Sequence, residues 1–361
     1  MTGFIRPRGL IGLMEEVMIS QEEYREFQKD FLERFAQARG EIHKRVVGLE
    51  DLIRVFFGCV LGRGHLAVQA SPGMGKTTAI MTMAGILHAN FVRIPFVPTM
   101  QPQDLGLQPI PVEGGRETTR WTIKEGPLFR ADIFFGNEFN RAPEKVQSAL
   151  LSALEEYEFQ YLGEMKKLRP FFTAVIDYNT LESAGTYGFS EAAFDRFMAT
   201  VDIRGYDSET LCEIIATSER KKMEPDLVDL KKIFTTEELL ASAAKLYQYF
   251  KRYDSSSSWL VRYLEAVLSA VRSDDDVSRD PRNRQAVGPS PRGAEDAKAL
   301  SRVFAFLDGE DLIWPEHAKE AIRYAFAGKF FVKPKAMNKG IVEEMVIERA
   351  LRQTPIPGVR R

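Results

Sequence analysis

The stretch Ala70-Ser-Pro-Gly-Met-Gly-Lys-Thr77 decides the fold of this chain, and it stands between two patterned segments. Residues 66–69 before it form an apolar run, and residues 78–87 after it repeat apolar side chains as a helix does. Strand, glycine loop and helix, in this order, are what a phosphate-binding loop requires. Ala70 stands where the strict motif has glycine, so the match is to the relaxed form. The alternative is a plain glycine turn between a strand and a helix.

Each residue type in this loop has a physical task in phosphate binding. Gly73 and Gly75 let backbone N–H groups turn toward the phosphates with no Cβ in the way. Lys76 reaches the β- and γ-phosphates, and the Thr77 hydroxyl can bind Mg²⁺. The positive end of the following helix faces the same anions. The residues predicted to hold the nucleotide are Pro72, Gly73, Met74, Gly75, Lys76, Thr77 and Thr78.

The composition of the 361 residues narrows the class of protein. The 49 basic and 51 acidic side chains nearly cancel, so the charge does not favour a nucleic-acid partner. The four histidines are scattered, which argues against a zinc cluster. No apolar run reaches the ~20 residues of a membrane span, and residues 1–20 make a poor signal peptide. With Cys59 and Cys212 predicted as buried thiols, we expect a cytoplasmic protein without membrane insertion.

Apolar strands alternate with helices over the first part of the chain. This alternation predicts an α/β fold in which helices cover both faces of a doubly wound parallel sheet. Two short hairpins, around residues 114 and 163, interrupt the pattern. The expected strands are residues 66–69, 91–96, 131–136, 171–176 and 199–203.

The remainder of the chain, before the sheet and after residue 206, is predicted as helices. Ser20 is the expected N-cap of a first helix that ends near Gly40. Residues 273–290 are polar and charged and contain Pro and Gly, which predicts a mobile loop. The expected later helices cover residues 208–220, 236–250, 258–271, 293–307 and 315–326, with an amphipathic segment at 341–351.

Four polar residues outside the loop complete a candidate site for phosphoryl transfer to water. Glu138 follows one strand and can polarise the water, while Asn179 follows the next and can hold that water or the γ-phosphate. Arg196 and Arg292 offer guanidinium groups for a terminal phosphate. Each has a structural alternative. For Glu138 it is a carboxylate near a helix start, and for Asn179 a turn residue. For Arg196 it is a surface ion pair, and for Arg292 an exposed helix surface.

Further motifs accompany the phosphate loop: residues 96–99 and 103–105, Asn137-Glu-Phe-Asn-Arg-Ala-Pro143, residues 147–151, 182–186 and 191–197, and Ser290-Pro-Arg292. Together they resemble the MoxR family of AAA+ ATPases, from about residue 46 to residue 332. The resemblance implies an AAA+ αβα P-loop core and a helical lid, with a nucleotide between them. It divides the chain into an N-terminal helical extension (1–44), the core with two hairpin inserts (45–204), and the lid with the C-terminal tail (205–361).

The resemblance also implies roles for single residues. Val47 and Gly48 would lie beside the adenine. Glu138 would be the Walker B glutamate, and Asn179 would be the sensor 1 residue. ATP or ADP and Mg²⁺ are the implied cofactors.

Assembly into hexameric rings is a further implication of the resemblance. Arg196 would be the arginine finger given to the ATP of the neighbouring subunit, and Arg292 would be sensor 2. The two hairpins look like inserts on the ring face that touch partners. Family members usually work with von Willebrand factor A domain proteins, so such a protein or another client is the expected partner.

One position departs from the family pattern. Asn137 stands where the family has the Walker B aspartate, whose carboxylate balances Mg²⁺ through water and bonds the Thr77 hydroxyl. Asparagine keeps an acceptor oxygen but loses a negative charge that a partly buried metal would feel. Thr77 and Asn137 are still the predicted metal residues. We expect ATP to bind, with weak Mg²⁺ affinity and slow hydrolysis.

The leading prediction is an ATP-hydrolysing, ring-forming remodelling chaperone that assembles or activates a partner complex. Its rival is a nucleotide-gated scaffold that hydrolyses ATP too slowly to act as a motor, and Asn137 keeps this alternative open. A third alternative is a small-molecule kinase, against which the long helical segment and Ser290-Pro-Arg292 speak. The balanced charge disfavours a DNA-dependent motor.

Overall fold

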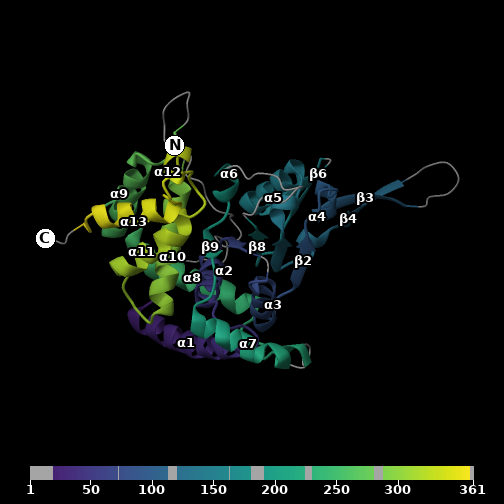
Figure 1. The fold of residues 1–361 in the computed structure, drawn as a ribbon. Coiled ribbons are helices and arrows are strands. Elements are labelled where there is room, and N and C mark those ends of the chain that lie inside the picture. Colours follow the sequence, from purple (N-terminus) through teal and green to yellow (C-terminus); the bar gives the residue numbers. More distant parts are fainter. Residues whose placement is uncertain are drawn as a thin grey trace.

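The computed structural model describes residues 19–71, 73–112, 120–161, 163–179, 191–223, 230–279 and 288–357. Pro72, the turn around residue 114 and the motif at 182–186 lie outside these ranges. Figure 1 shows two parts, a sheet with its covering helices and a mainly helical part beside it. Within the described ranges, no helix has both the length and the apolar character needed to cross a bilayer.

A five-stranded parallel sheet lies at the centre of the first part, and it confirms the predicted α/β fold class. The strand order is β2-β5-β8-β1-β9, so β8 lies between β1, which leads into the phosphate loop, and β5, which ends at Asn137. Because every pair in this sheet is parallel, the carboxyl ends of the strands share one edge. The strands are β1 (Leu66–Ala70), β2 (Phe91–Pro95), β5 (Ile133–Asn137), β8 (Thr173–Tyr178) and β9 (Ala199–Ile203).

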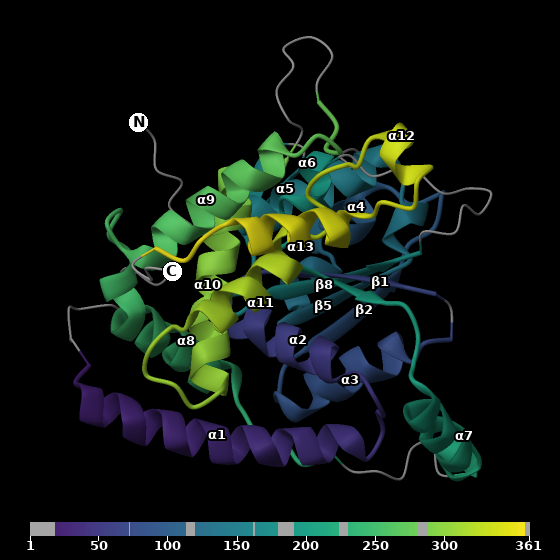
Figure 2. The ribbon, with the colours of Figure 1, turned by 60° about the vertical axis from the view of Figure 1, so that its left-hand side comes forward.

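Helices cover both faces of the sheet because successive strand residues point to opposite sides. Phe135 belongs to the core that includes α2 (Glu50–Gly62) and α3 (Lys76–Ile86). Phe134, its neighbour in the chain, belongs to the second core, under α5 (Glu144–Glu156). Figure 2 shows α2 and α3 on one side of the sheet and α5 on the other. The arrangement is an αβα sandwich.

Two antiparallel hairpins leave this sandwich, as predicted. In the first, Pro109 pairs with Ile123, and in the second, Phe159 pairs with Lys166. Figure 1 shows β3 and β4 reaching away from the sheet on the side opposite to the helical part. The hairpin strands and short helices are β3 (Leu107–Val112), β4 (Arg120–Glu125), β6 (Glu158–Tyr161), β7 (Glu164–Lys167), α4 (Pro102–Leu105), η1 (Pro127–Arg130), η2 (Phe139–Arg141) and α6 (Glu191–Phe194).

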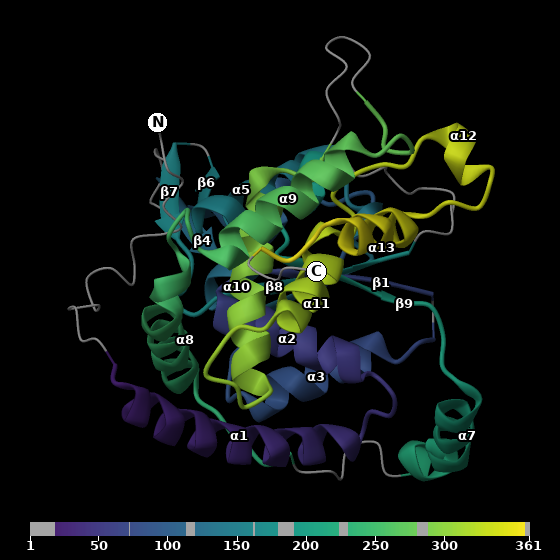
Figure 3. The same ribbon diagram turned by 90° about the vertical axis from the view of Figure 1, so that its left-hand side faces the viewer.

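Helix α10 (Pro291–Leu307) is the centre of the helical part, where it contacts α2, α8, α9 and α11. Its N-cap is Ser290, whose side chain accepts a hydrogen bond from the amide of Arg292. The long helix α1 (Gln21–His43) runs beneath both parts (Figure 3). The other helices are α7 (Ser208–Met223), α8 (Thr236–Phe250), η3 (Lys251–Tyr253), α9 (Trp259–Ser273), α11 (Pro315–Phe326), α12 (Pro334–Met337) and α13 (Glu343–Gln353).

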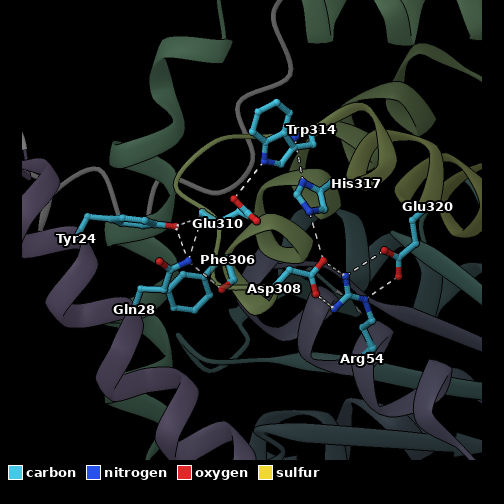
Figure 4. Close-up of polar contacts among 9 residues, drawn as sticks. All are labelled: Tyr24, Gln28, Arg54, Phe306, Asp308, Glu310, Trp314, His317 and Glu320. Atoms are coloured by element: carbon cyan, nitrogen blue, oxygen red, sulfur yellow. Dashed lines mark hydrogen bonds and ion pairs between the residues drawn. The ribbon is translucent and has the colours of Figure 1, made fainter. Parts of the chain in front are cut away.

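Polar contacts fasten the helical part to α1 and α2 (Figure 4). Arg54 of α2 donates two hydrogen bonds to Asp308 at 2.7 and 2.8 Å and two to Glu320 at 2.7 and 3.0 Å. Buried Gln28 of α1 donates to the carbonyl oxygen of Phe306 at 3.0 Å. Charge-assisted pairs of this kind fix the orientation of the two parts as well as holding them together.

Two expectations about single residues are wrong. Gly40 does not end α1, because Ile42 is fully buried in the next turn and its packing offsets the roughly 1 kcal/mol that glycine costs in a helix. Cys59 is buried as predicted, but Cys212 is exposed on α7. The apolar surroundings of Cys212 in the sequence therefore do not correspond to a buried helix face.

The first half of the predicted mobile loop at 273–290 is held in place. Val277 is fully buried and forms a β-bridge with Val332. Nε of Arg349 lies 3.0 Å from Oδ2 of Asp274. Acidic residues of this segment, predicted to be mobile, are thus paired with α13. Residues 280–287 lie outside the described ranges.

Candidate nucleotide site

The glycine loop has the backbone that its sequence requires. Gly73 has φ 84° and Gly75 has φ 68°, and the left-handed region to which these angles belong suits glycine. Gly75 is also the N-cap of α3, so the first amides of that helix face the loop. Thr77 and Thr78 stand in the first turn of α3. The strand, loop and helix order is present, and its ability to hold phosphates is still a prediction.

Lys76 meets a carboxylate that the sequence analysis did not single out. Its Nζ lies 3.1 Å from Oδ2 of Asp177 and donates to the carbonyl oxygen of Ala70 at 3.2 Å. The Lys76 side chain is 13% exposed, whereas Asp177 is completely buried. The other carboxylate oxygen of Asp177 accepts a short hydrogen bond from the backbone N–H of Glu138. Asp177 therefore links the phosphate-loop lysine to the residue expected to polarise water.

Burial raises the pKa of Asp177, and the Glu138 amide and the Lys76 ammonium act against this shift. The sequence held one signal for this residue, a single acidic side chain at the end of an otherwise apolar strand. Its burial and its contacts follow from the position of β8 between β1 and β5. Strand order is a property that local sequence does not specify.

Glu138 and Asn179 lie at the same edge of the sheet, each held by a neighbour. Glu138 has left-handed backbone angles, and its carboxylate, 45% exposed, pairs with Nε of Arg141 at 2.7 Å. Asn140, which is buried, donates from its side chain to the carbonyl oxygen of Asn179 at 3.0 Å. Glu138 also stands at the start of η2, so the structural alternative for this residue describes its position too.

A Mg²⁺ ion brought by a nucleotide suits the oxygen atoms available at this edge. The Thr77 hydroxyl, the Asn137 amide oxygen and the Asp177 carboxylate all come from segments that begin or end at this edge, and hard oxygen donors are what Mg²⁺ prefers. Among the described residues, no group of three or more His, Cys, Asp or Glu side chains could hold a metal alone. The phosphates of the nucleotide would therefore have to contribute ligands.

Gly48, which precedes α2, is connected to the phosphate loop by one tyrosine, Tyr206. Gly48 has φ 72°, and a Cβ there would come within 2.2 Å of Cγ2 of Thr210 and 3.3 Å of Cδ1 of Tyr206. The Tyr206 hydroxyl donates to the carbonyl oxygen of Met74 at 2.7 Å. Val47 precedes Gly48 and is half-buried. Tyr206 joins the candidate adenine region to the loop, and nothing in its local sequence marks it.

The two arginines share a different partner. Nε of Arg196 lies 2.7 Å from Oε2 of Glu155, and a terminal nitrogen of Arg292 lies 2.6 Å from Oε1 of the same carboxylate. They border a cavity of about 100 Å³ whose lining also includes Arg63, His65, Tyr157 and Met198. The structure thus brings Arg196 and Arg292 together, at the end of α5.

This arginine pair and the phosphate loop lie at opposite edges of the sheet. Arg196 precedes β9, whereas the loop follows β1, and these strands run parallel with Leu66 beside Ala199. Five strand residues separate the two edges, which at about 3.3 Å per residue is about 16 Å. Lys76 and Arg196 of one chain therefore do not face the same phosphate.

Comparisons with known proteins identify relatives of this chain. Residues 65–199 match the family described as "ATPase family associated with various cellular activities (AAA)". Chaperone MoxR1 of Mycobacterium tuberculosis is 30% identical over 88% of this chain and 81% of its own length. Protein MoxR of Methylorubrum extorquens is 25% identical over 91% of this chain and 96% of its own.

A solved structure has the same fold. It is a candidate ATPase from Cytophaga hutchinsonii, which superimposes with a TM-score of 0.77 at 25% identity and covers 93% of this chain and 97% of its own. The matched family segment runs from the residue before β1 to the first residue of β9, so it contains the loop, Asn137, Glu138 and Asn179. The chain belongs to the MoxR family of AAA+ ATPases.

Proposed function

We propose that this ATPase binds ATP with Mg²⁺ at the loop 70–77 and hydrolyses it at a contact between two copies in a ring. The observation that carries the proposal is that the loop and Arg196 stand at opposite edges of the sheet, whose five-residue strands are about 16 Å long. Charge that develops on a transferred phosphoryl group needs a cation beside it. A head-to-tail contact, which closes into a ring, would bring Arg196 of one copy to the loop of the next.

The residues at the loop edge would exchange their present partners for the nucleotide. Lys76 would move its ammonium from Asp177 to the phosphates, and Glu138 would turn from Arg141 to the attacking water. Asn179, anchored by Asn140, would hold that water or the γ-phosphate. Bound Mg²⁺ would neutralise phosphate charge near Thr77 and the adjacent strand ends.

Arg292 belongs to the same proposal as Arg196. Both guanidiniums are held by Glu155, so a phosphate that displaces this carboxylate would meet two cations. The presence of a phosphate at Arg292 would affect the position of the lid, because Arg292 stands at the start of α10.

The division of the chain at residues 44 and 204 and the cytoplasmic location stay predictions.

The client side of the proposal rests on family likeness. One relative is named a chaperone, and we propose that this chain likewise assembles or activates a partner complex, with a von Willebrand factor A domain protein as the expected partner. The hairpins β3–β4 and β6–β7 are the surfaces we expect it to use. No nucleic-acid partner is proposed, since the charge is balanced.

A slow, nucleotide-gated scaffold is the second candidate. It is favoured by Asn137, which lacks the carboxylate of the family pattern, and by the ion pair that holds Glu138 to Arg141. Turnover per protomer in the assembled state separates the two. If a protomer hydrolyses less than one ATP in the time that a client stays bound, the scaffold is supported.

Two measurements test the proposal. Lys76→Ala should lose nucleotide affinity and nucleotide-dependent assembly, measured by calorimetry and by light scattering after size exclusion. A pull-down with Glu138→Gln in ATP should retain the client, with Lys76→Ala as the matched control that cannot enter the ATP state. Unchanged affinity and assembly in Lys76→Ala would overturn the nucleotide site. Recovery of no von Willebrand-type protein would overturn the partner assignment alone.

A further inference from the structure

Asn137 and Asp177 are neighbours across two adjacent strands. Gly136 of β5 pairs with Ile176 of β8. One residue further along each strand, Asn137 and Asp177 therefore stand side by side, separated by the strand spacing of about 4.8 Å. The position that lacks a carboxylate thus has a carboxylate beside it.

The two side chains also point to the same face of the sheet. Phe135 and Val175 stand two residues before Asn137 and Asp177, and both belong to the core that includes α3. Because side chains on one face recur every second residue, Asn137 and Asp177 share this face. It is the face on which the helix that begins with Lys76 packs.

Asp177 has a charge balance that a nucleotide would disturb. Its Oδ2 is buried, and the Lys76 ammonium 3.1 Å away supplies the positive charge beside it. When phosphates occupy the loop, that ammonium is drawn to them. A buried carboxylate left without a cation is unfavourable. A divalent cation that arrives with the nucleotide restores the balance, whereas the neutral amide of Asn137 cannot take this part.

We infer that Asp177 supplies the carboxylate that balances nucleotide-bound Mg²⁺, one strand away from the family position at 137. This role rests on the proposed ATP site and assigns a further positioning residue within it. Asp177 also accepts from the Glu138 amide. The same carboxylate therefore couples the metal to the backbone of the residue that orients water.

The inference changes what is expected of Asn137. If the charge were simply missing, Asn137→Asp would strengthen Mg²⁺ binding. With Asp177 already present, a second carboxylate on the neighbouring strand and the same face adds repulsion between like charges. Asn137→Asp alone should therefore not strengthen Mg²⁺ binding. Exchange of the two residues, Asn137→Asp with Asp177→Asn, moves the carboxylate from β8 to the family position on β5.

The test measures the affinity of a fluorescent ATP analogue in excess Mg²⁺ and in EDTA, with turnover left out. The ratio of the two affinities is the metal-dependent gain. In Asp177→Asn the metal-dependent gain should fall by about tenfold or more. The affinity for the analogue in EDTA should stay the same or increase, because Lys76 is released from its ion pair with Asp177. The exchanged double variant should recover the gain. Asp132→Asn is the matched control, since Asp132 is also buried but sits before β5 with Asn90 and Arg169 as partners.

The outcomes separate the inference from the proposed function. A metal-dependent gain in Asp177→Asn equal to that of the wild type overturns the inference, as does a tenfold or larger increase in Asn137→Asp alone. Absence of analogue binding in the wild-type chain overturns the proposed function instead. Should Asp177→Asn fail to fold, Mn²⁺ bound with nucleotide is compared between the wild type and Asn137→Asp by paramagnetic resonance: an unchanged Mn²⁺ affinity supports the inference and a tenfold or larger increase overturns it.

Discussion

Nε of Arg196 lies 2.7 Å from Oε2 of Glu155, and this ion pair sits at the amino-terminal edge of the sheet, away from the phosphate loop. The second oxygen of Glu155 binds Arg292. One carboxylate thus holds two residues that the sequence assigns to phosphate recognition. It keeps two like charges together on a surface that a neighbouring copy could approach.

Glu155→Gln should lower the free energy of unfolding by about 1–2 kcal/mol, because two charge-assisted hydrogen bonds are lost while the two guanidiniums still repel each other. We expect no larger effect because the side chains of Glu155, Arg196 and Arg292 are all partly exposed, and water weakens their ion pairs. Urea unfolding measures it. Glu156→Gln, next in the chain and exposed, should change stability by less than about 0.5 kcal/mol. Equal effects in the two variants would argue against the shared carboxylate.

Two inactive variants should repair each other when mixed. Lys76→Ala removes the loop lysine and Arg196→Ala removes the cation proposed for the neighbouring site, so each alone should have little turnover. In a randomly mixed ring, one contact in four joins an intact loop to an intact arginine. Turnover of a 1:1 mixture should therefore recover to roughly a quarter of the wild-type value.

The mixing experiment requires a control measurement on the Arg196→Ala protein. Arg196→Ala protein should bind nucleotide as the wild type does, since Arg196 stands at the edge of the sheet opposite to its own loop, a strand length of about 16 Å. A mixture no faster than its two components, measured under conditions where both assemble, would contradict a site shared between two copies.

The fold was predictable because its signals are local. Five apolar strands, the glycine pair of the loop and the capping serine at residue 20 each determine structure within a few neighbours, and all occur as expected. The placement of Arg196 was also available in principle, since a residue that precedes a parallel strand must lie at the edge opposite to a loop that follows one.

The partners of the site residues were not predictable in the same way. Asp177 contacts Lys76 because β8 is inserted between β1 and β5, and this order is set by the packing of the whole sheet. Tyr206 reaches Met74 from a segment that follows β9, more than a hundred residues later in the chain. Contacts of such range depend on tertiary structure that a local pattern does not contain.

Gly48→Ala should destabilise the protein by about 1–3 kcal/mol, because a Cβ there combines a left-handed backbone with a close approach to Thr210. Gly163→Ala provides the matched control: its φ of 84° is as unfavourable, but nothing lies within 4 Å of the new atom. The difference between the two variants in urea unfolding gives the effect of crowding alone. Nucleotide affinity should fall with Gly48→Ala and stay unchanged with Gly163→Ala. Equal losses of stability would mean that Thr210 and Tyr206 move aside.

The junction in Figure 4 should make stability depend on pH in acid. Burial of Asp308 would raise its pKa, but hydrogen bonds from His317 and Arg54 outweigh it and lower the pKa from 3.8 to about 2. A carboxylate with a depressed pKa binds fewer protons in the folded state than in the unfolded state, so its contribution is full above about pH 4 and is lost as the pH falls toward 2. Asp308→Asn should be less stable than the wild type at pH 5, and the gap should narrow in this window. Asp275→Asn, exposed on the loop after α9, is the control and should follow the wild type throughout. A gap that stays constant between pH 5 and pH 2.5 in urea unfolding would show that Asp308 acts through shape and not through its charge.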